Sequence, residues 1–247
     1  TSYNKHNRTP LYKMYYPFDI TPDFIYLHIV LSNIYVGFIV ITMVAGEDNI
    51  LSEVMLHLNG RFLLSQQNLH QSTEYLLQRE DRKNIADDFS YLIMVAIQEN
   101  VRLHKFAMDF EREFSYRLFI NLSFSAGLLC VLGFKVYTNP MGSFSFVFWI
   151  CAKVMEMLLI GHLGSKLMET TNQISSAFYE SSWELAIEKS RDTSANVRLM
   201  KTLLLAIGSG HKSFVLTGFK YFSVSLIAVL KILRVAASYF TFLTSMR

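Results

Sequence analysis

Charge is scarce in this sequence of 247 residues. Charged side chains make up 17% of the chain, whereas hydrophobic side chains make up 51%. Soluble domains usually carry about 25% charged residues, so the composition favours a membrane protein. The net charge of +3 is too small to indicate nucleic acid, and no basic run is interleaved with aromatic residues. We therefore expect a membrane protein that binds no nucleic acid.

Cysteine is also scarce, since only Cys130 and Cys151 occur and they form no CxxC motif. This excludes a disulfide framework. Both lie in apolar stretches, so we expect two buried free thiols with no bond between them. The histidines are scattered, and neither HExxH nor GxSxG is present. The sequence predicts no enzyme activity, no metal site and no cofactor.

The first residues lack the pattern of a secretory signal or a transit peptide. Residues 1–23 are polar and contain three prolines, which predicts an extended loop before the first membrane span. The sequon at Asn7 is a candidate glycosylation site if this loop is extracellular. A second sequon, at Asn121, lies inside an apolar stretch, and we expect it to stay unmodified.

Long apolar stretches predict four transmembrane helices. The first, at 24–44, has 21 residues without an acid, lysine or arginine. As a helix it would be about 31 Å long, enough to cross a bilayer. The others are predicted at 116–136, 144–167 and 213–247, and the last is longer than the bilayer core requires. The predicted fold class is therefore an all-α membrane protein.

The segments between these stretches are polar. Residues 45–115 carry mixed charges and apolar residues at helical spacing, which predicts a helical insert outside the lipid. Proline and glycine in 137–143 predict a tight turn. Residues 168–212 predict further polar helices, with a hinge or kink at Gly208-Ser209-Gly210. Most basic residues fall in the two long polar segments, so the positive-inside rule places these in the cytosol.

Two charged residues interrupt the third span. Lys153 and Glu156 are three residues apart, so their side chains can meet on one face of a helix. A charge pair inside the membrane faces protein or water rather than lipid. We expect a structural ion pair in preference to an anchor for a ligand.

Polar residues of the last span recur at spacings of three and four, which aligns them on one stripe of the helix. Such a stripe needs water or protein beside it. One interpretation is packing against polar partners in a helix bundle. The other is a pore-lining helix in which Phe242 and Met246 form an apolar constriction. Spacing alone leaves both open. The stripe consists of Lys231, Arg234, Ser238, Thr241 and Ser245.

Three segments resemble insect odorant receptors. Residues 238–243 (SYFTFL) and 217–226 (TGFKYFSVSL) are similar to the carboxy-terminal signature of that family. Residues 177–183 (AFYESSW) resemble its tyrosine and tryptophan motif. The resemblance covers the whole chain, which would correspond to helices four to seven, without the first three. One departure is that residues 208–212 (GSGHK) stand where the family often has proline before the final helix.

The resemblance implies a seven-helix membrane protein of inverted topology, with an extracellular carboxyl terminus, in the plasma membrane of sensory neurons. It implies a tetramer of tuning subunits and a shared co-receptor, joined by a cytosolic anchor made from the lower parts of helices four to seven. It implies that the seventh helix lines a nonselective cation pore. Pore or gate residues would then be Ser238, Thr241, Phe242, Ser245 and Met246, and Lys231 and Arg234 would face the pore or an interface.

The resemblance also implies a small volatile odorant, bound in an apolar pocket of the outer membrane half that helices four and six help to form. Aromatic and aliphatic walls suit such a ligand, although ordinary core packing explains any one of these positions equally well. The candidate ligand-binding residues are Tyr26, Val30, Leu31, Ile34, Phe146, Trp149, Ile150 and Lys153.

Other functional classes of membrane protein are also compatible with the sequence. The chain ends SYFTFLTSMR, unlike the co-receptor, which favours a tuning subunit. The end motif of gustatory receptors is missing, although a related gustatory-type receptor is an alternative. A secondary transporter would also have charges and broken helices in the membrane, but no internal repeat is found. A membrane scaffold subunit would give no ligand-dependent current.

Overall fold

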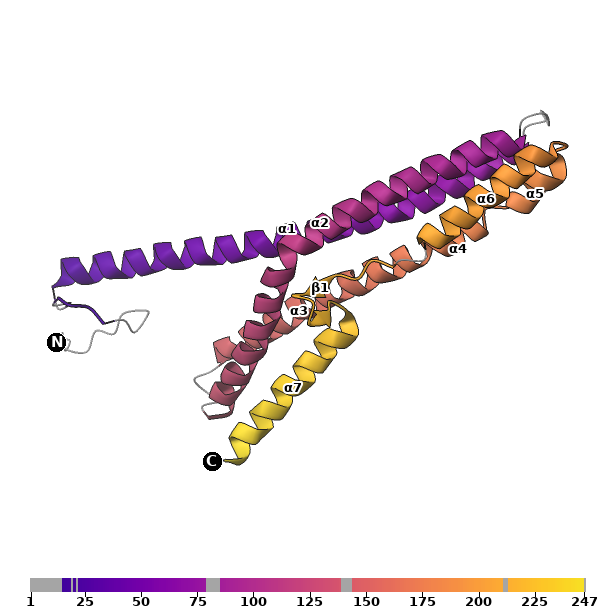
Figure 1. Ribbon diagram of the computed structural model, residues 1–247. Helices are drawn as coiled ribbons and strands as arrows, with labels where there is room; N and C mark the ends of the chain where they lie inside the picture. The colour runs from indigo at the N-terminus through magenta and orange to yellow at the C-terminus, as the bar shows by residue number, and fades with distance from the viewer. Residues whose placement is uncertain are drawn as a thin grey trace. The chain divides into compact units, whose positions relative to one another are not determined.

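A computed structural model describes residues 15–18, 20, 22–78, 85–138, 144–210 and 213–246 (Figure 1). The chain divides into two compact units, residues 1–51 and 52–247. The predicted glycosylation site Asn7 and most of the loop 1–23 lie outside the described residues. So do the charged cluster at 79–83 and most of the predicted turn 137–143.

Seven helices and one two-stranded sheet are present among the described residues. Four helical stretches, in α1, α2, α3 with its continuation, and α7, are long and apolar enough to cross a membrane. This confirms four spans and a helical fold. The helices are α1 (Asp23–Gln78), α2 (Ile85–Thr138), α3 (Phe144–Asn172), α4 (Ile174–Tyr179), α5 (Trp183–Lys189), α6 (Thr193–Gly210) and α7 (Leu226–Ser245). The strands are β1 (Thr217–Gly218) and β2 (Phe222–Ser223).

The first two helices are much longer than a membrane span. They contain 56 and 54 residues, or about 80 Å each at the helical rise, whereas a bilayer core is about 30 Å thick. The insert at 45–115 is therefore made of continuations of the two span helices and not of separate elements. The chain has no proline between Pro22 and Pro140 to end these helices early.

The predicted hinge at residues 208–210 is wrong in position, because α6 continues through Gly210. A Cβ atom at Gly210 would lie 3.1 Å from the backbone nitrogen of Ser175 in α4. Glycine therefore lets α6 lie close to α4 rather than bending the helix. Figure 1 shows α6 beside the first half of α2 and close to α4 and α5.

The last predicted helix also differs from the structure, since residues 217–223 form a β-hairpin instead of its first turns. Phe219 and Lys220 have φ values of 49° and 61°, which match the left-handed central residues of a type I′ turn. Helix α7 begins only at Leu226, where the Ser225 hydroxyl caps it by accepting the Ala228 N–H at 3.2 Å. Its 20 residues span about 30 Å, the thickness of a bilayer core.

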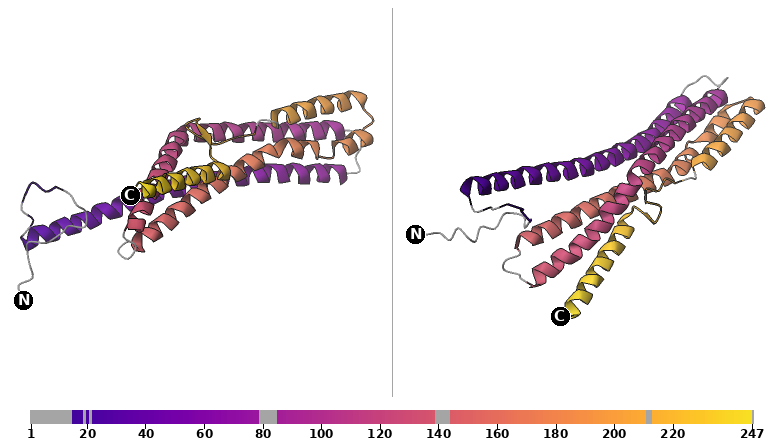
Figure 2. Two further views of the ribbon diagram at one scale, coloured as in Figure 1. Left: turned by 90° about the horizontal axis from the view of Figure 1, so that it is seen from below. Right: turned by 60° about the vertical axis from the view of Figure 1, so that its left-hand side comes forward.

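Helix α7 runs alongside α2 and α3 (Figure 2). Leu122, Met157 and Val229, one from each helix, are fully buried together. Glycines of α3 allow this approach, because a Cβ atom at Gly161 would lie 2.8 Å from Val229 Cγ2 and one at Gly164 would collide with the Val224 carbonyl oxygen. Small residues at helix interfaces are typical of membrane proteins.

Both cysteines are free, but they are not both buried. Cys130 is half-buried, and its thiol donates a hydrogen bond to the Ala236 carbonyl at 3.2 Å. Cys151 is exposed, because it lies on the side of α3 that faces away from Met157 and Gly161. The expectation of two buried thiols is therefore wrong for Cys151.

Candidate functional site

Helix α7 has two distinct faces. Val229 and Ala236 are buried against α2 and α3, and they lie on one side of the helix. At 100° per residue, the polar stripe falls on the opposite side. Packing against α2 and α3 therefore does not explain the stripe, which is open to water or to another chain. The exposed stripe residues are Lys231, Arg234, Ser238, Thr241 and Ser245.

Hydroxyl groups of the stripe use their protons within the helix. Thr241 Oγ1 donates to the Ser238 carbonyl at 2.8 Å, and Ser245 Oγ donates to the Phe242 carbonyl at 2.8 Å. Each oxygen keeps lone pairs that point away from these bonds. Thr241 and Ser245 can thus accept hydrogen bonds from water or contact a cation without leaving their own donors unsatisfied.

Phe242 and Met246 border the stripe near the end of α7. They are 58% and 72% exposed, so neither side chain is used in the packing of the helix. Large apolar side chains beside a polar stripe are suited to a constriction that closes by dewetting. All five predicted pore residues therefore lie on the uncovered side of α7.

The two basic residues of the stripe lie in the first half of α7. Because α7 begins at Leu226, Lys231 and Arg234 are only about 8 Å and 12 Å along its axis. Neither has an ion-pair partner among the residues that the structure describes. Long basic side chains at such a depth can extend to the membrane boundary.

A polar network joins α2 to α3 inside the predicted spans. Lys153 Nζ donates to Glu156 Oε1 at 2.6 Å and to Asn121 Oδ1 at 3.3 Å, and Asn121 Nδ2 donates to Glu156 Oε1 at 3.4 Å. The buried Ser125 hydroxyl donates to the Asn121 carbonyl at 2.6 Å. The side chains of Lys153 and Glu156 are 18% and 26% exposed. The predicted ion pair is present, and it includes partners on α2 that the sequence did not reveal.

The residues predicted to bind an odorant fall into both units. In the first unit, Tyr26 and Val30 are half-buried, whereas Leu31 and Ile34 are exposed. In the second unit, Trp149 is exposed and Ile150 is half-buried.

Two of the predicted ligand residues contact α2. Lys135 Nζ lies 4.7 Å from the centre of the Phe146 ring, and Lys153 belongs to the polar network. Phe146 and Lys153 therefore have packing partners within the protein. A role of the eight positions in ligand binding stays a prediction.

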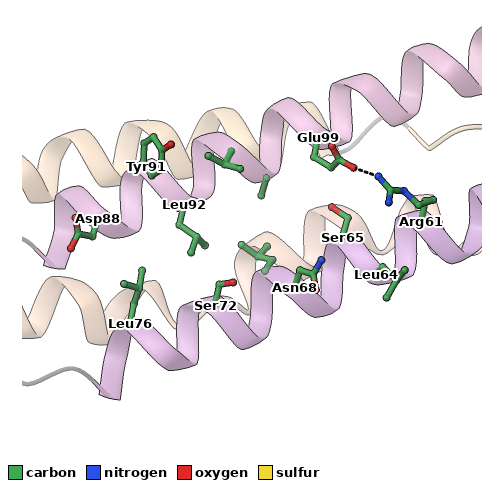
Figure 3. A pocket seen from close by; sticks show the side chains of 13 residues that line it. Arg61, Leu64, Ser65, Asn68, Ser72, Leu76, Asp88, Tyr91, Leu92 and Glu99 are labelled. Carbon is green, nitrogen blue, oxygen red and sulfur yellow. Dashed lines mark hydrogen bonds and ion pairs between the residues drawn. The ribbon is translucent and has the colours of Figure 1, made fainter.

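A groove of about 580 Å³ lies between the second half of α1 and the first half of α2 (Figure 3). Leucine and valine side chains form much of its wall, and the Arg61–Glu99 ion pair at 2.9 Å lies at one end. None of the eight predicted ligand residues lines it. Its residues belong to the predicted insert at 45–115, so the groove does not coincide with the ligand-binding residues predicted from the sequence.

Polar side chains connect the helices around this groove. Thr170 Oγ1 donates to Asn59 Oδ1 at 2.7 Å, and both residues are buried. Lys189 Nζ donates to the Leu77 carbonyl at 2.6 Å. The half-buried ring of His104 lies 5.3 Å from the Phe62 ring, edge-on, and this burial lowers the pKa of its imidazole.

Four apolar helical stretches, a glycine-packed final helix and a polar extension outside the spans define a multi-pass α-helical membrane protein. The family described as 7tm Odorant receptor matches residues 2–237. The chain belongs to this family of receptors. The resemblance drawn from the three sequence segments is thereby confirmed.

Relatives of this chain include two receptors from Drosophila melanogaster. Odorant receptor 35a is 43% identical over 96% of this chain, and odorant receptor 74a is 43% identical over 98%. The chain spans 58% and 60% of their respective lengths. The fold is similar to that of the insect olfactory receptor OR5 from Machilis hrabei in complex with eugenol. That match has a TM-score of 0.75 and 13% identity, and covers 94% of this chain and 56% of the other.

Proposed function

We propose that this chain is the part comprising helices four to seven of an odorant-binding tuning subunit in a heteromeric, odour-gated, nonselective cation channel. The partner subunits are odorant receptor co-receptors, and the ligand is a small volatile molecule. The channel lies in the plasma membrane of a sensory neuron. The observation that carries the proposal is the polar, uncovered face of α7 opposite its packed face.

A pore in the centre of a tetramer needs one face of each lining helix to be left free by its own subunit. The exposed side of α7 satisfies this condition, with hydroxyl groups along it and Phe242 and Met246 near the outer end. The hydroxyl oxygens suit water and cations. Lys231 and Arg234 lie toward the other end, where their charge can be displaced from the narrow part of the pathway.

Assembly is supported by helix α6, which carries exposed apolar residues outside the predicted spans. An uncovered apolar face in water is typical of a surface that another protein covers. This helix belongs to the predicted cytosolic anchor, so we assign the face to contacts between subunits. Its exposed apolar residues are Val197, Met200, Leu204 and Leu205.

The proposed topology places the insert at 45–115 and helices α4 to α6 in the cytosol. The loop 1–23 and the end of α7 are then extracellular. Most basic residues lie in the proposed cytosolic segments, which is the distribution that the positive-inside rule requires. The odorant pocket of this proposal lies in the outer half of the membrane.

The test is whole-cell current from the full-length protein, expressed with and without the co-receptor during perfusion of small volatiles. We expect odour-evoked, nonselective cation current that requires both subunits. Phe242→Ala and Met246→Ala should change gating or ion permeation, since they remove large side chains from the exposed face. Phe240→Ala is the matched control, because Phe240 is a half-buried aromatic residue near Phe242 that packs against Gly133 and Tyr137 of α2.

Either of two results would contradict the proposal. Surface expression with the co-receptor but no current across a broad odour panel would favour a transporter or a scaffold. Current that is unaffected by both Phe242→Ala and Met246→Ala but altered by Phe240→Ala would support a channel but contradict this choice of pore-lining face.

A further inference from the structure

The hairpin β1–β2 presents an unusual tip between helices α6 and α7. Phe219 and Lys220 occupy left-handed conformations, where glycine and asparagine are normally preferred. A bulky aromatic residue at positive φ is strained, and strain of this kind is typical of functional positions. The identity of these two residues is therefore not explained by the turn itself.

Side chains of the tip point away from the protein core. Phe219 is 51% exposed and Tyr221 is 75% exposed, and their rings stack with centroids 5.9 Å apart. Lys220, between them, is also exposed. The tip thus presents an aromatic–basic–aromatic surface.

The tip is held firmly against α2. The Phe219 N–H donates to Ser115, to its carbonyl at 3.1 Å and to its hydroxyl at 2.7 Å. Thr217 Oγ1 donates to the Glu111 carboxylate. The Phe219 ring also contacts Tyr116 and Phe119 of α2, with centroids 5.8 Å and 6.0 Å away. An aromatic cluster therefore joins the hairpin to α2.

The position of this cluster along α2 and α7 places it at a membrane boundary. Arg112 and Glu113 precede it on α2, and the apolar stretch of the second span follows it. Helix α7 begins three residues after β2, at Leu226. Tyrosine side chains concentrate at such boundaries, where one part of the ring is in the lipid and the hydroxyl is in water.

We propose that the hairpin tip binds the anionic cytosolic leaflet of the membrane. Phe219 and Tyr221 enter the headgroup region, and the Lys220 ammonium contacts negatively charged phospholipid headgroups. This assignment rests on the cytosolic side of the proposed topology. The cytosolic leaflet carries the anionic lipids of a plasma membrane and attracts basic residues beside a membrane span. The charge of the tip and its depth therefore both match this surface.

The contact has a consequence for the proposed channel. The hairpin leads directly into α7, and the Leu226 N–H donates to Ser165 Oγ of α3 at 2.8 Å. The Val224 N–H donates to the Leu216 carbonyl at 2.7 Å within the same connection. A tip held by lipid thus fixes the start of the pore-lining helix relative to α2 and α3.

The test replaces Tyr221 with the photocrosslinker benzoyl-phenylalanine in the full-length receptor, assembled with the co-receptor. The complex is placed in nanodiscs with equal parts of phosphatidylcholine and phosphatidylserine, irradiated and analysed by mass spectrometry. We expect lipid adducts with about fivefold preference for phosphatidylserine, the effect of one basic residue near an anionic surface. Lys220→Gln should remove the preference and leave the adducts.

Tyr91 provides a matched control, because it is a tyrosine with 73% exposure on the same helix α2. It lies 25 residues before Tyr116, about 37 Å along the helix axis and far from the boundary. The crosslinker at this position should give no lipid adduct. Lipid adducts at both positions would show that the crosslinking is unspecific, and the adducts at position 221 would then no longer support the proposal.

Other results overturn the proposal. Crosslinks from position 221 to protein, whether to a second copy or to the co-receptor, would assign the tip to a subunit interface. If both lipids are labelled equally, and Lys220→Gln leaves this labelling unchanged, Lys220 does not contact the anionic headgroups. The adducts are detected without measuring current, so an inactive channel with intact lipid labelling would contradict the proposed function and not this inference.

Discussion

The two halves of the second unit are held together in different ways. Around the proposed cytosolic groove, side-chain hydrogen bonds connect different helices, as between Asn59 and Thr170. Around α7, backbones approach closely over glycine, as at Gly161 and Gly164. In lipid, where apolar side chains gain nothing by leaving solvent, close packing is the main source of attraction between helices. The comparison predicts that the two halves respond to different kinds of substitution.

The largest effect is expected from Gly164→Ala. The added Cβ atom would collide with the Val224 carbonyl oxygen, a backbone atom that cannot move without displacing the start of α7. We expect a loss of stability of about 3 kcal/mol and loss of odour-evoked current. Thermal unfolding of the purified full-length receptor measures the loss of stability. Whole-cell recording measures the loss of current, and surface labelling shows how much receptor reaches the membrane.

Gly127→Ala is the matched control in α2, because a Cβ atom there meets no atom within 4 Å. Alanine favours a helix over glycine, so this variant should be neutral or slightly more stable. Equal losses of stability in the two variants would show that close approach over Gly164 is not what holds α7 in place.

A smaller effect is expected from Thr170→Val in the cytosolic half. This change removes the hydroxyl that donates to Asn59 Oδ1 and leaves a buried oxygen without its donor, at a cost of about 1–3 kcal/mol. The double variant Asn59→Leu/Thr170→Val should recover part of the loss, because no polar group is then left unpaired. Denaturation midpoints of Thr170→Val, Asn59→Leu and the double variant check this, and additive losses would contradict it.

Acidic pH should destabilise the same half through His104. Burial lowers the pKa of its imidazole, so the unfolded chain binds more protons than the folded chain at mildly acidic pH. The contribution of neutral His104 to the free energy of unfolding is complete above the pKa of the unfolded chain, about 6.5. It is lost as the pH falls through the lowered pKa of the folded chain. His104→Gln should flatten the dependence of the unfolding midpoint on pH below neutrality. An unchanged pH profile would assign the dependence to other groups.

The smallest effect is expected from Glu99→Gln at the rim of the groove. Its carboxylate contacts Arg61 at 2.9 Å, but the Arg61 side chain is 62% exposed. Exposed ion pairs contribute about 0.5 kcal/mol, and salt screens them. The unfolding midpoint should therefore differ from that of the unchanged protein only at low salt. A loss comparable to that of Thr170→Val would mean that the groove depends on this pair.

The spans were predictable from the sequence because each is a local feature. An apolar stretch of about 20 residues needs a membrane whatever the rest of the chain does. The Lys153–Glu156 pair was predictable for the same reason, since a spacing of three places both on one helical face. The polar stripe of α7 was readable by the same periodicity, and the structure adds that its own unit leaves it uncovered.

Features that depend on distant contacts were not predictable. Asn121 lies 32 residues before Lys153, and no periodicity links them. The hairpin at 217–223 was missed because its turn contains phenylalanine and lysine where asparagine and glycine would have indicated a turn. The side of α3 that packs against α2 likewise became visible only in the structure.

The central claim is that the exposed stripe of α7 lines the cation pathway. Its most direct test is cysteine accessibility in the channel with the co-receptor, with Cys130→Ala and Cys151→Ala as background. Ser238→Cys, Thr241→Cys and, on the packed side, Phe240→Cys are compared using a membrane-impermeant cationic thiosulfonate during odour application. The account predicts irreversible block at positions 238 and 241 and none at 240. Block at 240 without block at 238 or 241 would contradict it.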